Sequence, residues 1–304
     1  MGHALQSPAD SPILRTHPRL TFQAGSYSYE ILSDGGKTTY RVSNGTDTFS
    51  EPLLYAVGSA HIGQTFVFRK DDKFYESRVS YYTATDALDW TLGDVLASPP
   101  TAVEAAGRDI TGDQARDCFS CHSTGAVVNN KLELDKLAPG VECEACHGPG
   151  AKHVAAMRSG DLQNPYIFNP AKLDAETLSQ EFCGACHRGV DAVLLMPNFG
   201  GLNNVRFQPY RLFDSHGHTG DDLHLACTGC HDPHLNLVLN DDSYDSRCTV
   251  CHAPRTASRT AKLCPVAKSR CVSCHMPKID LPGSHYKFTD HRIRIVRPGG
   301  PYPL

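Results

Sequence analysis

The sequence predicts an α+β fold, in which a small antiparallel β-rich N-terminal domain precedes a domain of short helices and loops. Apolar and polar residues alternate between Leu20 and Trp90, as they do in half-buried strands. All 13 cysteines of the 304-residue chain lie from Cys118 onward. The 25 Gly and 20 Pro residues favour loops over long regular elements.

Residues 1–19 hold Pro, Ser and His and are expected to be irregular. Residues 26–32 and 37–43 flank SDGG, which is typical of a hairpin, and residues 64–69 and 73–82 flank two aspartates in the same way. The β-rich domain is therefore expected over residues 20–107, ending in a Pro-containing linker at 97–107.

The remaining domain spans residues 108–304. Helices are expected at 152–160 and 173–187, with Asp174 capping the second.

Twelve of the cysteines form six copies of the pattern Cys-x-x-Cys-His, which is typical of covalent haem c attachment. Two thiols one turn apart form thioethers with the porphyrin, and the following histidine binds the iron. The copies predict six haems held by Cys118, Cys121, His122; Cys143, Cys146, His147; Cys183, Cys186, His187; Cys227, Cys230, His231; Cys248, Cys251, His252; and Cys271, Cys274, His275. These haems would form much of the domain's core.

Paired cysteines can also form zinc sites or a disulfide framework. Neither requires a histidine directly after every pair, and here all six pairs have one. Cys264 is left over and is expected to be a buried or free thiol.

Each iron needs a second axial ligand, and ten histidines outside the motifs could provide it. We expect mainly bis-histidine ligation. The first candidates are His153, His234, His285 and His291, with His61 next and at least one of His216, His218 and His224 after it. His3 and His17 are weaker candidates. Met276 directly follows His275 and cannot reach the opposite face of the same haem.

The formal charge of −4 understates the acidity of a haem-loaded chain. Six oxidised bis-histidine haems with their propionates would bring it to about −10. We therefore expect no nucleic-acid partner, but redox proteins or extracellular electron acceptors. No apolar run is long enough for a membrane span.

Covalent haem attachment takes place outside the cytoplasmic membrane, so a periplasmic or extracellular location is expected. The first residues, MGHALQSPADSPILR, do not form a signal peptide. The expectation is that the chain is the mature part of a longer precursor or lacks its original start.

Several segments, CEACHGPGAKH, RFQPYRL, CTGCHDPH, CPVAKSRCVSCHMPK and FTDHRIRIV, together resemble the cytochrome c554-like family of multihaem cytochromes. The namesake of that family is the tetrahaem electron carrier of ammonia oxidation. The resemblance covers roughly residues 50–298. It implies a mostly α and loop haem domain, with haems in stacked and perpendicular pairs and largely bis-histidine ligation.

Electron transfer, as a carrier or relay, is the function this sequence favours. One alternative is a redox enzyme of the nitrite, hydroxylamine or tetrathionate reductase type, with one open haem. Another is a subunit of a conductive filament or other homo-oligomer, with His3 or His17 donated to a neighbouring subunit.

Overall fold

The computed structural model describes residues 1–93, 99–163, 165–197, 200–215, 225–252, 264–297, 300 and 302. The chain divides into two compact units, Met1–Phe168 with Pro282–Tyr286, and Asn169–Leu281 with Lys287–Leu304. This division differs from the boundary expected at residue 107, because the segment after that residue packs on the N-terminal sheet. The expected α+β class holds at the coarse level, since an antiparallel β-rich N-terminal region precedes a more helical one.

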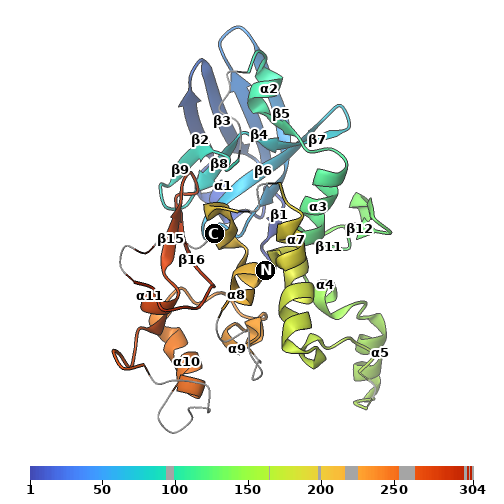
Figure 1. Cartoon of the computed structure of the whole chain (residues 1–304). Coiled ribbons are helices and arrows are strands. Elements are labelled where there is room, and N and C mark those ends of the chain that lie inside the picture. The colour runs from blue at the N-terminus through green and yellow to red at the C-terminus, as the bar shows by residue number, and fades with distance from the viewer. Residues whose placement is uncertain are drawn as a thin grey trace. The chain divides into compact units, whose positions relative to one another are not determined.

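The first unit is built on one antiparallel sheet (Figure 1). Its strands are β1 (Leu5–Gln6), β2 (Arg19–Ala24), β3 (Tyr27–Asp34), β4 (Lys37–Ser43), β5 (Thr48–Val57), β6 (Gly63–Lys70), β7 (Lys73–Ser77), β8 (Val79–Tyr82), β9 (Ala87–Trp90) and β10 (Gly107–Asp109). The main order is β10-β7-β6-β5-β4-β3-β2, while β1 pairs with β5 and β8 joins β6 to β9. Both hairpins expected from the sequence, β3–β4 and β6–β7, are present.

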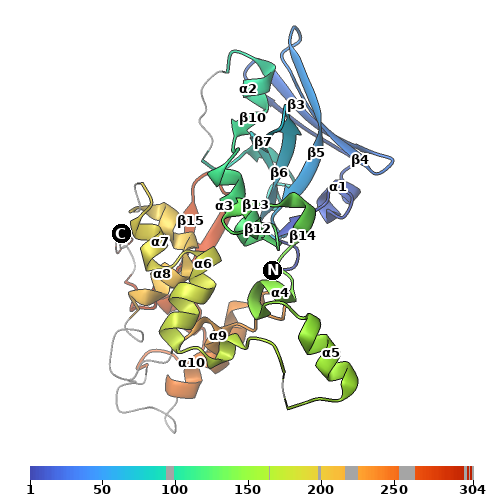
Figure 2. The same cartoon turned by 90° about the vertical axis from the view of Figure 1, so that its right-hand side faces the viewer.

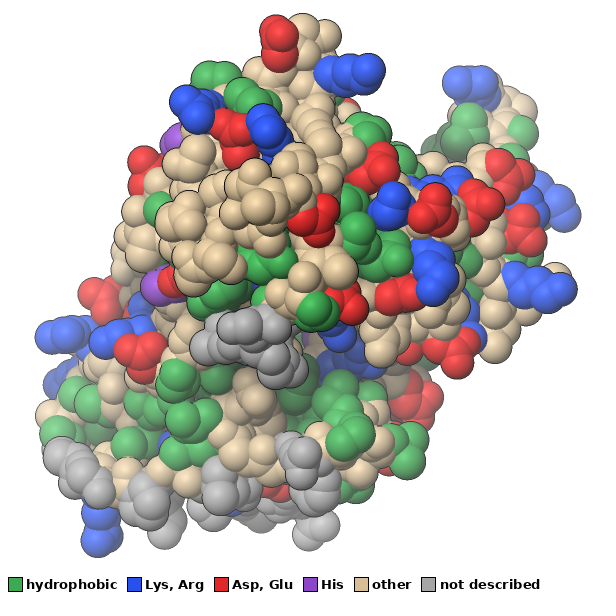
Figure 3. Space-filling model, turned by 90° about the horizontal axis from the view of Figure 1, so that it is seen from above, with side chains coloured by type: hydrophobic (Ala, Val, Ile, Leu, Met, Phe, Trp, Pro, Cys, Tyr) green, Lys and Arg blue, Asp and Glu red, His purple; other side chains and the backbone are tan. Residues whose placement is uncertain are grey.

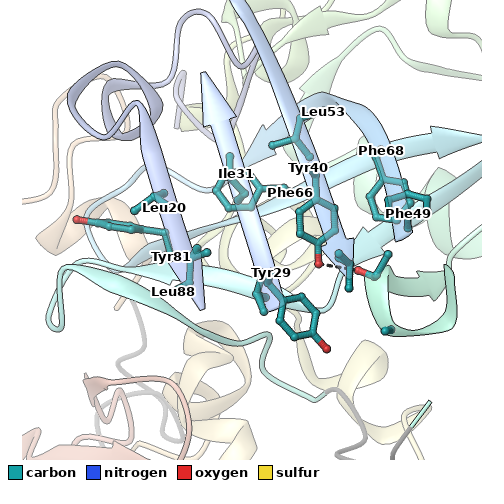
Figure 4. Close-up of a cluster of buried hydrophobic side chains, with 14 of the residues drawn as sticks. Leu20, Tyr29, Ile31, Tyr40, Phe49, Leu53, Phe66, Phe68, Tyr81 and Leu88 are labelled. Atoms are coloured by element: carbon teal, nitrogen blue, oxygen red, sulfur yellow. Dashed lines mark hydrogen bonds between the residues drawn. The ribbon is translucent and has the colours of Figure 1, made fainter. Parts of the chain in front are cut away.

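Aromatic side chains fill the core of this sheet (Figure 4). Tyr40 and Phe68 are fully buried with ring centres 5.6 Å apart. Trp90 of β9 packs edge-on against Phe22 of β2 and Tyr29 of β3, so strands far apart in the sheet order share one core. Each such aromatic removes a large apolar area from water, which is the main stabilising contribution available here.

One segment expected to be irregular and one expected to be a linker are structured and packed on the sheet. Before residue 20, β1 pairs with β5, and the helix α1 (Pro12–Thr16) begins at Ser11, whose Oγ accepts a bond from Leu14 N. In the expected linker, α2 (Ala102–Ala106) is followed directly by β10. Tyr40 Oη donates to Ala106 O at 2.9 Å, the dashed line of Figure 4. The linker prediction was wrong because small apolar residues that pack on a sheet resemble those of a spacer.

A second apolar cluster lies against β6 and β7 and holds the helix α3 (Asp113–His122). Figure 2 shows α3 beside the short strands that follow it. The remaining elements of this unit are β11 (Ser123–Thr124), β12 (Val127–Val128), β13 (Lys131–Leu132), a 3₁₀ turn (Leu134–Lys136), β14 (Ala138–Pro139), α4 (Cys143–His147) and α5 (Ala151–Ser159). The helix expected at 152–160 is therefore confirmed as α5.

Short helical pieces make up most of the second unit. They are the 3₁₀ turn Pro170–Lys172, the π-helical segment Thr177–Cys183, α6 (Gly184–His187), α7 (Val190–Leu194), the 3₁₀ turn Leu202–Arg206, α8 (Gln208–Phe213), α9 (Cys227–Cys230), the 3₁₀ turn Asp241–Tyr244, α10 (Asp245–His252), α11 (Cys271–His275), β15 (Lys278–Leu281) and β16 (Tyr286–Thr289). The helix expected at 173–187 is present in pieces, and Asp174 Oδ1 accepts from Thr177 N at 2.9 Å, as its capping role requires.

Candidate haem-binding sites

The first Cys-x-x-Cys-His motif ends helix α3 and is anchored to the sheet by one of its own residues. Phe119, between the two cysteines, is 1% exposed. Its ring packs edge-on against Tyr55 at 5.4 Å and Phe74 at 5.9 Å. The apolar position inside the motif therefore holds the helix, and the cysteines on either side are half-buried.

All six motifs lie in helical turns, on α3, α4, α6 with the π-helical segment before it, α9, α10 and α11. One helical turn brings two cysteines separated by two residues to the same side of the helix. The histidine that follows lies at or just beyond the helix end. This is the local geometry that attachment of a porphyrin through two thioethers and one imidazole requires.

Hydrogen bonds orient the imidazoles of three motif histidines in the same way. His122 Nδ1 lies 3.1 Å from Ala4 O, His147 Nδ1 lies 2.9 Å from Phe168 O, and His275 Nδ1 lies 3.0 Å from Arg294 O. A carbonyl can only accept, so Nδ1 carries the proton in each case and Nε2 keeps its lone pair. Metal-binding histidines use the same arrangement, which sets the tautomer and the ring orientation. These residues therefore fit haem c.

A fourth motif histidine, His231, is oriented by a hydroxyl group. Tyr244 Oη lies 3.4 Å from His231 Nδ1 and donates its own proton to Val238 O at 3.0 Å. Because that proton is committed to Val238, Nδ1–H of His231 is the donor in the longer contact. Nε2 of His231 is then also an unprotonated acceptor.

In three places a side chain near one motif accepts a hydrogen bond from the backbone at the start of the next motif. Thr124 Oγ1, two residues after His122, accepts from Glu142 N at 2.8 Å. Ser179 Oγ accepts from Cys227 N at 3.3 Å. Asp245, at the start of α10, accepts from Cys271 N at 2.8 Å and Arg270 N at 2.5 Å. The motifs are thus joined in the pairs first–second, third–fourth and fifth–sixth.

Cysteine side chains of successive motifs are hydrogen-bonded at two places in the second unit, Cys183 with Cys227 and Cys248 with Cys271. A hydrogen bond from Cys183 lowers the pKa of the Cys227 thiol to about 6. Burial and then Cys248 raise the pKa of Cys230. Burial also raises the pKa of Cys248, against an opposing hydrogen bond from Cys271. In a haem-loaded chain these sulfurs are thioethers and do not titrate.

Two of the expected second ligands have the same ring orientation as the motif histidines. His153 Nδ1, on α5, lies 2.6 Å from Pro165 O, and His291 Nδ1 lies 3.0 Å from Thr289 O. Both are partly buried. Burial lowers the pKa of His291 to about 4, so its imidazole is neutral at pH 7. Of the expected ligands, the structure brings His291 next to the motif residue His231, with ring centres 6.2 Å apart.

The remaining candidates have different surroundings. His285 Nε2 lies 2.8 Å from Asp89 Oδ2, and its ring contacts Tyr82 at 4.7 Å, so an acid already engages the nitrogen that usually binds iron. His234 is exposed, with Nδ1 3.2 Å from Asp232 Oδ1. His61 is exposed in the turn between β5 and β6. His216, His218 and His224 lie outside the described residues. His17 is engaged through both nitrogens, by Ile13 O and Asp86.

Zinc sites and disulfides, the other structures that paired cysteines form, each have a recognisable geometry. No disulfide bond joins the described cysteines, and no group of three Cys, His, Asp or Glu side chains there converges as metal ligands would. Cys264 is exposed, and hydrogen bonds from Ala267 N and then Val266 N lower its pKa.

Charges of both signs are mixed on the face seen in Figure 3, where Lys and Arg lie among Asp and Glu. Within the part of the chain that the structure describes, no helix has the length and apolar composition to cross a membrane.

The class of the protein is that of the multihaem c-type cytochromes. Two features of the sites agree with this class: the Cys-x-x-Cys-His motifs lie in helical turns, and three of their imidazoles donate the Nδ1 proton to a backbone carbonyl. More particularly, residues 98–148 match the family model described as cytochrome c554 and c-prime. The chain is also similar to the multihaem cytochrome MtrA of Shewanella baltica (strain OS185), at 24% identity over 180 residues. That match covers 54% of this chain and 46% of the relative, so the chain spans about half of the relative's length. No solved structure matches the chain.

Sequence reasoning missed the residues that join the motifs, Thr124, Ser179 and Asp245. Each is a short polar acceptor within a few residues of a Cys-x-x-Cys-His copy, and such residues are frequent helix caps. The sequence carries that signal, but it does not show that the capped helix belongs to the next motif along the chain.

Proposed function

We propose that the chain holds six haem c groups, one at each Cys-x-x-Cys-His motif, and transfers electrons among them. Bound haem supplies reversible one-electron oxidation and reduction of its iron. The observation that carries the proposal is the direct linkage of successive attachment sites in the second unit, where Cys227 N donates to Ser179 Oγ at 3.3 Å and Cys271 N donates to Asp245 at 2.8 Å.

The polypeptide's own contribution is to hold these attachment sites at fixed separations. Ser179 and Asp245 each bond a residue of one helix to the first turn of the helix that carries the next motif. The carbonyls of Ala4, Phe168 and Arg294 keep three imidazoles in the tautomer that leaves Nε2 available. A rigid arrangement suits electron transfer, because it allows the iron charge to change with little movement of the surrounding atoms.

Export to the periplasm or the cell exterior belongs to the same proposal, since haem is attached there. The partners would be redox proteins or extracellular electron acceptors. The acidic charge of the haem-loaded chain favours partners with basic surfaces, through faster electrostatically guided encounter. Haems would also complete the core of the second unit, where apolar side chains such as Leu194, Leu195 and Val250 are exposed in the polypeptide alone.

The test is haem quantification and electron paramagnetic resonance on one sample of oxidised holoprotein. Six haems per chain, all low-spin, are expected, because each iron would have two strong ligands. A high-spin signal that amounts to one haem would instead indicate an open iron and favour a redox enzyme. Fewer than six haems would overturn the proposed number.

A further inference from the structure

We propose that His291 is the second axial ligand of the haem attached through Cys227, Cys230 and His231. The inference deepens the proposed function and rests on it. It goes further by assigning one histidine to one particular iron.

The separation of the two rings is the first argument. Two imidazoles that bind one metal from opposite sides, each at about 2.0 Å, have ring centres about 6.3 Å apart. The ring centres of His231 and His291 are 6.2 Å apart. Their planes are inclined at 38°, and rotation of either ring about its metal–nitrogen bond leaves this separation unchanged.

The tautomers are the second argument. Thr289 O accepts the Nδ1 proton of His291 at 3.0 Å. His231 directs its Nδ1 proton to Tyr244 Oη, whose own proton is donated to Val238 O. Both histidines therefore keep a lone pair on Nε2, which is what a shared iron requires.

The backbone on both sides of His291 is held in place, which is the third argument. Ser215 Oγ donates to His291 O at 3.1 Å and accepts from Ile293 N at 2.8 Å. The preceding residue, Asp290, is fully buried and pairs with Arg211 at 2.9 Å. A ligand presented from such a segment loses little conformational entropy when it binds.

His187, the histidine of the third motif, is also near His291, since its charged form would lower the pKa of His291. The direct ring contact is with His231, and this favours the fourth motif. The experiment must therefore separate the two irons.

The experiment counts perturbed haems, meaning haems that are high-spin or missing, in full-length holoprotein variants. His291→Ala is expected to perturb one of the six haems, and added imidazole should restore its low-spin signal. His291→Met should give one haem with a methionine–iron charge-transfer band and a raised reduction potential. The matched control is His17→Ala, in which all six haems should remain low-spin, because both His17 nitrogens are engaged by Ile13 O and Asp86.

Double variants then assign the iron. If His231 and His291 share one iron, the variant with both changed to Ala has one perturbed haem, the same number as either single variant. The variant with His187 and His291 both changed to Ala should have two. The reverse pattern would place His291 on the third haem and overturn the assignment.

Six low-spin haems in the His291→Ala variant would remove His291 from ligation altogether. That result would leave the proposed function intact as long as the parent chain carries six low-spin haems. A parent chain that lacks them would refute the proposed function itself.

Discussion

Arg211 and Asp290 form an ion pair in the interior of the second unit, with Arg211 Nε 2.9 Å from Asp290 Oδ1 and Nη2 3.1 Å from Oδ2. The two side chains are 1% and 0% exposed. Asp290 Oδ2 also accepts from Arg294 Nη1 at 2.6 Å, and the carbonyl of Arg294 faces His275 Nδ1. The pair thus stabilises the segment that carries His291. Through Arg294 it also stabilises the carbonyl group that accepts a hydrogen bond from His275.

Removal of one partner should leave the other as an unpaired buried charge. Asp290→Ala is therefore expected to lower the free energy of unfolding of the second unit by about 3–5 kcal/mol. Denaturant titration, followed by circular dichroism and the Soret band, measures this loss. Asp232→Asn is the control, because the Asp232 side chain is 51% exposed, and it should change stability little. Equal effects of the two substitutions would contradict a structural role for the pair.

The same pair predicts a pH dependence. Burial alone would raise the pKa of Asp290, but hydrogen bonds from Arg211, Arg292 N and Arg294 outweigh it and lower the pKa below the ordinary value. The stabilisation is therefore complete above the unfolded value of about 3.9 and is lost as the pH falls through the lower folded value. As the pH is lowered from 5 into the strongly acidic range, the Asp290→Asn variant should lose less of its free energy of unfolding than the parent chain. Denaturant midpoints at each pH measure this difference. An identical acid loss in both would show that Asp290 does not contribute.

Phe119 should be needed for the stability of the first motif's helix but not for its haem. Phe119→Ala removes a ring that is 1% exposed and in contact with Tyr55 and Phe74, so a loss of about 3–5 kcal/mol is expected in the first unit. Ser120→Ala, at the neighbouring exposed position of the same motif, should have little effect. Haem content should be unchanged in both variants, because Cys118, Cys121 and His122 remain. Loss of that haem in Phe119→Ala alone would mean that the sheet contact is needed for attachment.

The hairpins and several helices could be predicted from local sequence. Apolar and polar residues alternate on both sides of SDGG and of the two-aspartate turn, and this was enough to predict the hairpins β3–β4 and β6–β7. A tight turn between two strands with alternating burial determines a hairpin locally. The structure of residues 5–16 and 102–109 could not be predicted. These residues depend on partners far along the chain, such as Tyr40 for Ala106, and no local period reveals such contacts.

In the candidate site, too, one part could be predicted from the sequence and another part could not. The six attachment motifs are contiguous patterns and are visible in the sequence, whereas the partners of the histidines are not. His291 and His285 both follow the last motif and were equivalent candidates. In the structure one lies beside His231, while the other meets Asp89, 196 residues away. Only the three-dimensional arrangement separates them.

Asp245 should determine how firmly the fifth and sixth motifs are joined. Its carboxylate accepts from both Arg270 N and Cys271 N at the start of α11, and Asp245→Ala should therefore cost about 0.5–2 kcal/mol, as loss of a helix cap does. Asp245→Asn keeps one acceptor oxygen and should cost less. These hydrogen bonds, the one from Cys271 N most, lower the pKa of the Asp245 carboxyl group. Its contribution to stability is therefore complete above the unfolded pKa of about 3.9 and is lost as the pH falls through the lower folded pKa. Equal stability of the Ala variant and the parent from pH 7 to pH 3 would show that Asp245 does not stabilise the contact between the fifth and sixth motifs.

Cys264 should be the single reactive thiol of the holoprotein. It is the one cysteine outside the six motifs, it is exposed, and hydrogen bonds from Ala267 N and Val266 N lower its pKa and favour the reactive thiolate. Ellman's reagent, applied to native and to denatured holoprotein, should therefore detect one thiol per chain in the parent and none in Cys264→Ser. The remaining twelve cysteines would be thioethers and would not react even after denaturation. Three thiols in the denatured parent, with two left in Cys264→Ser, would mean that one motif carries no haem, and the proposed number of six would then be wrong.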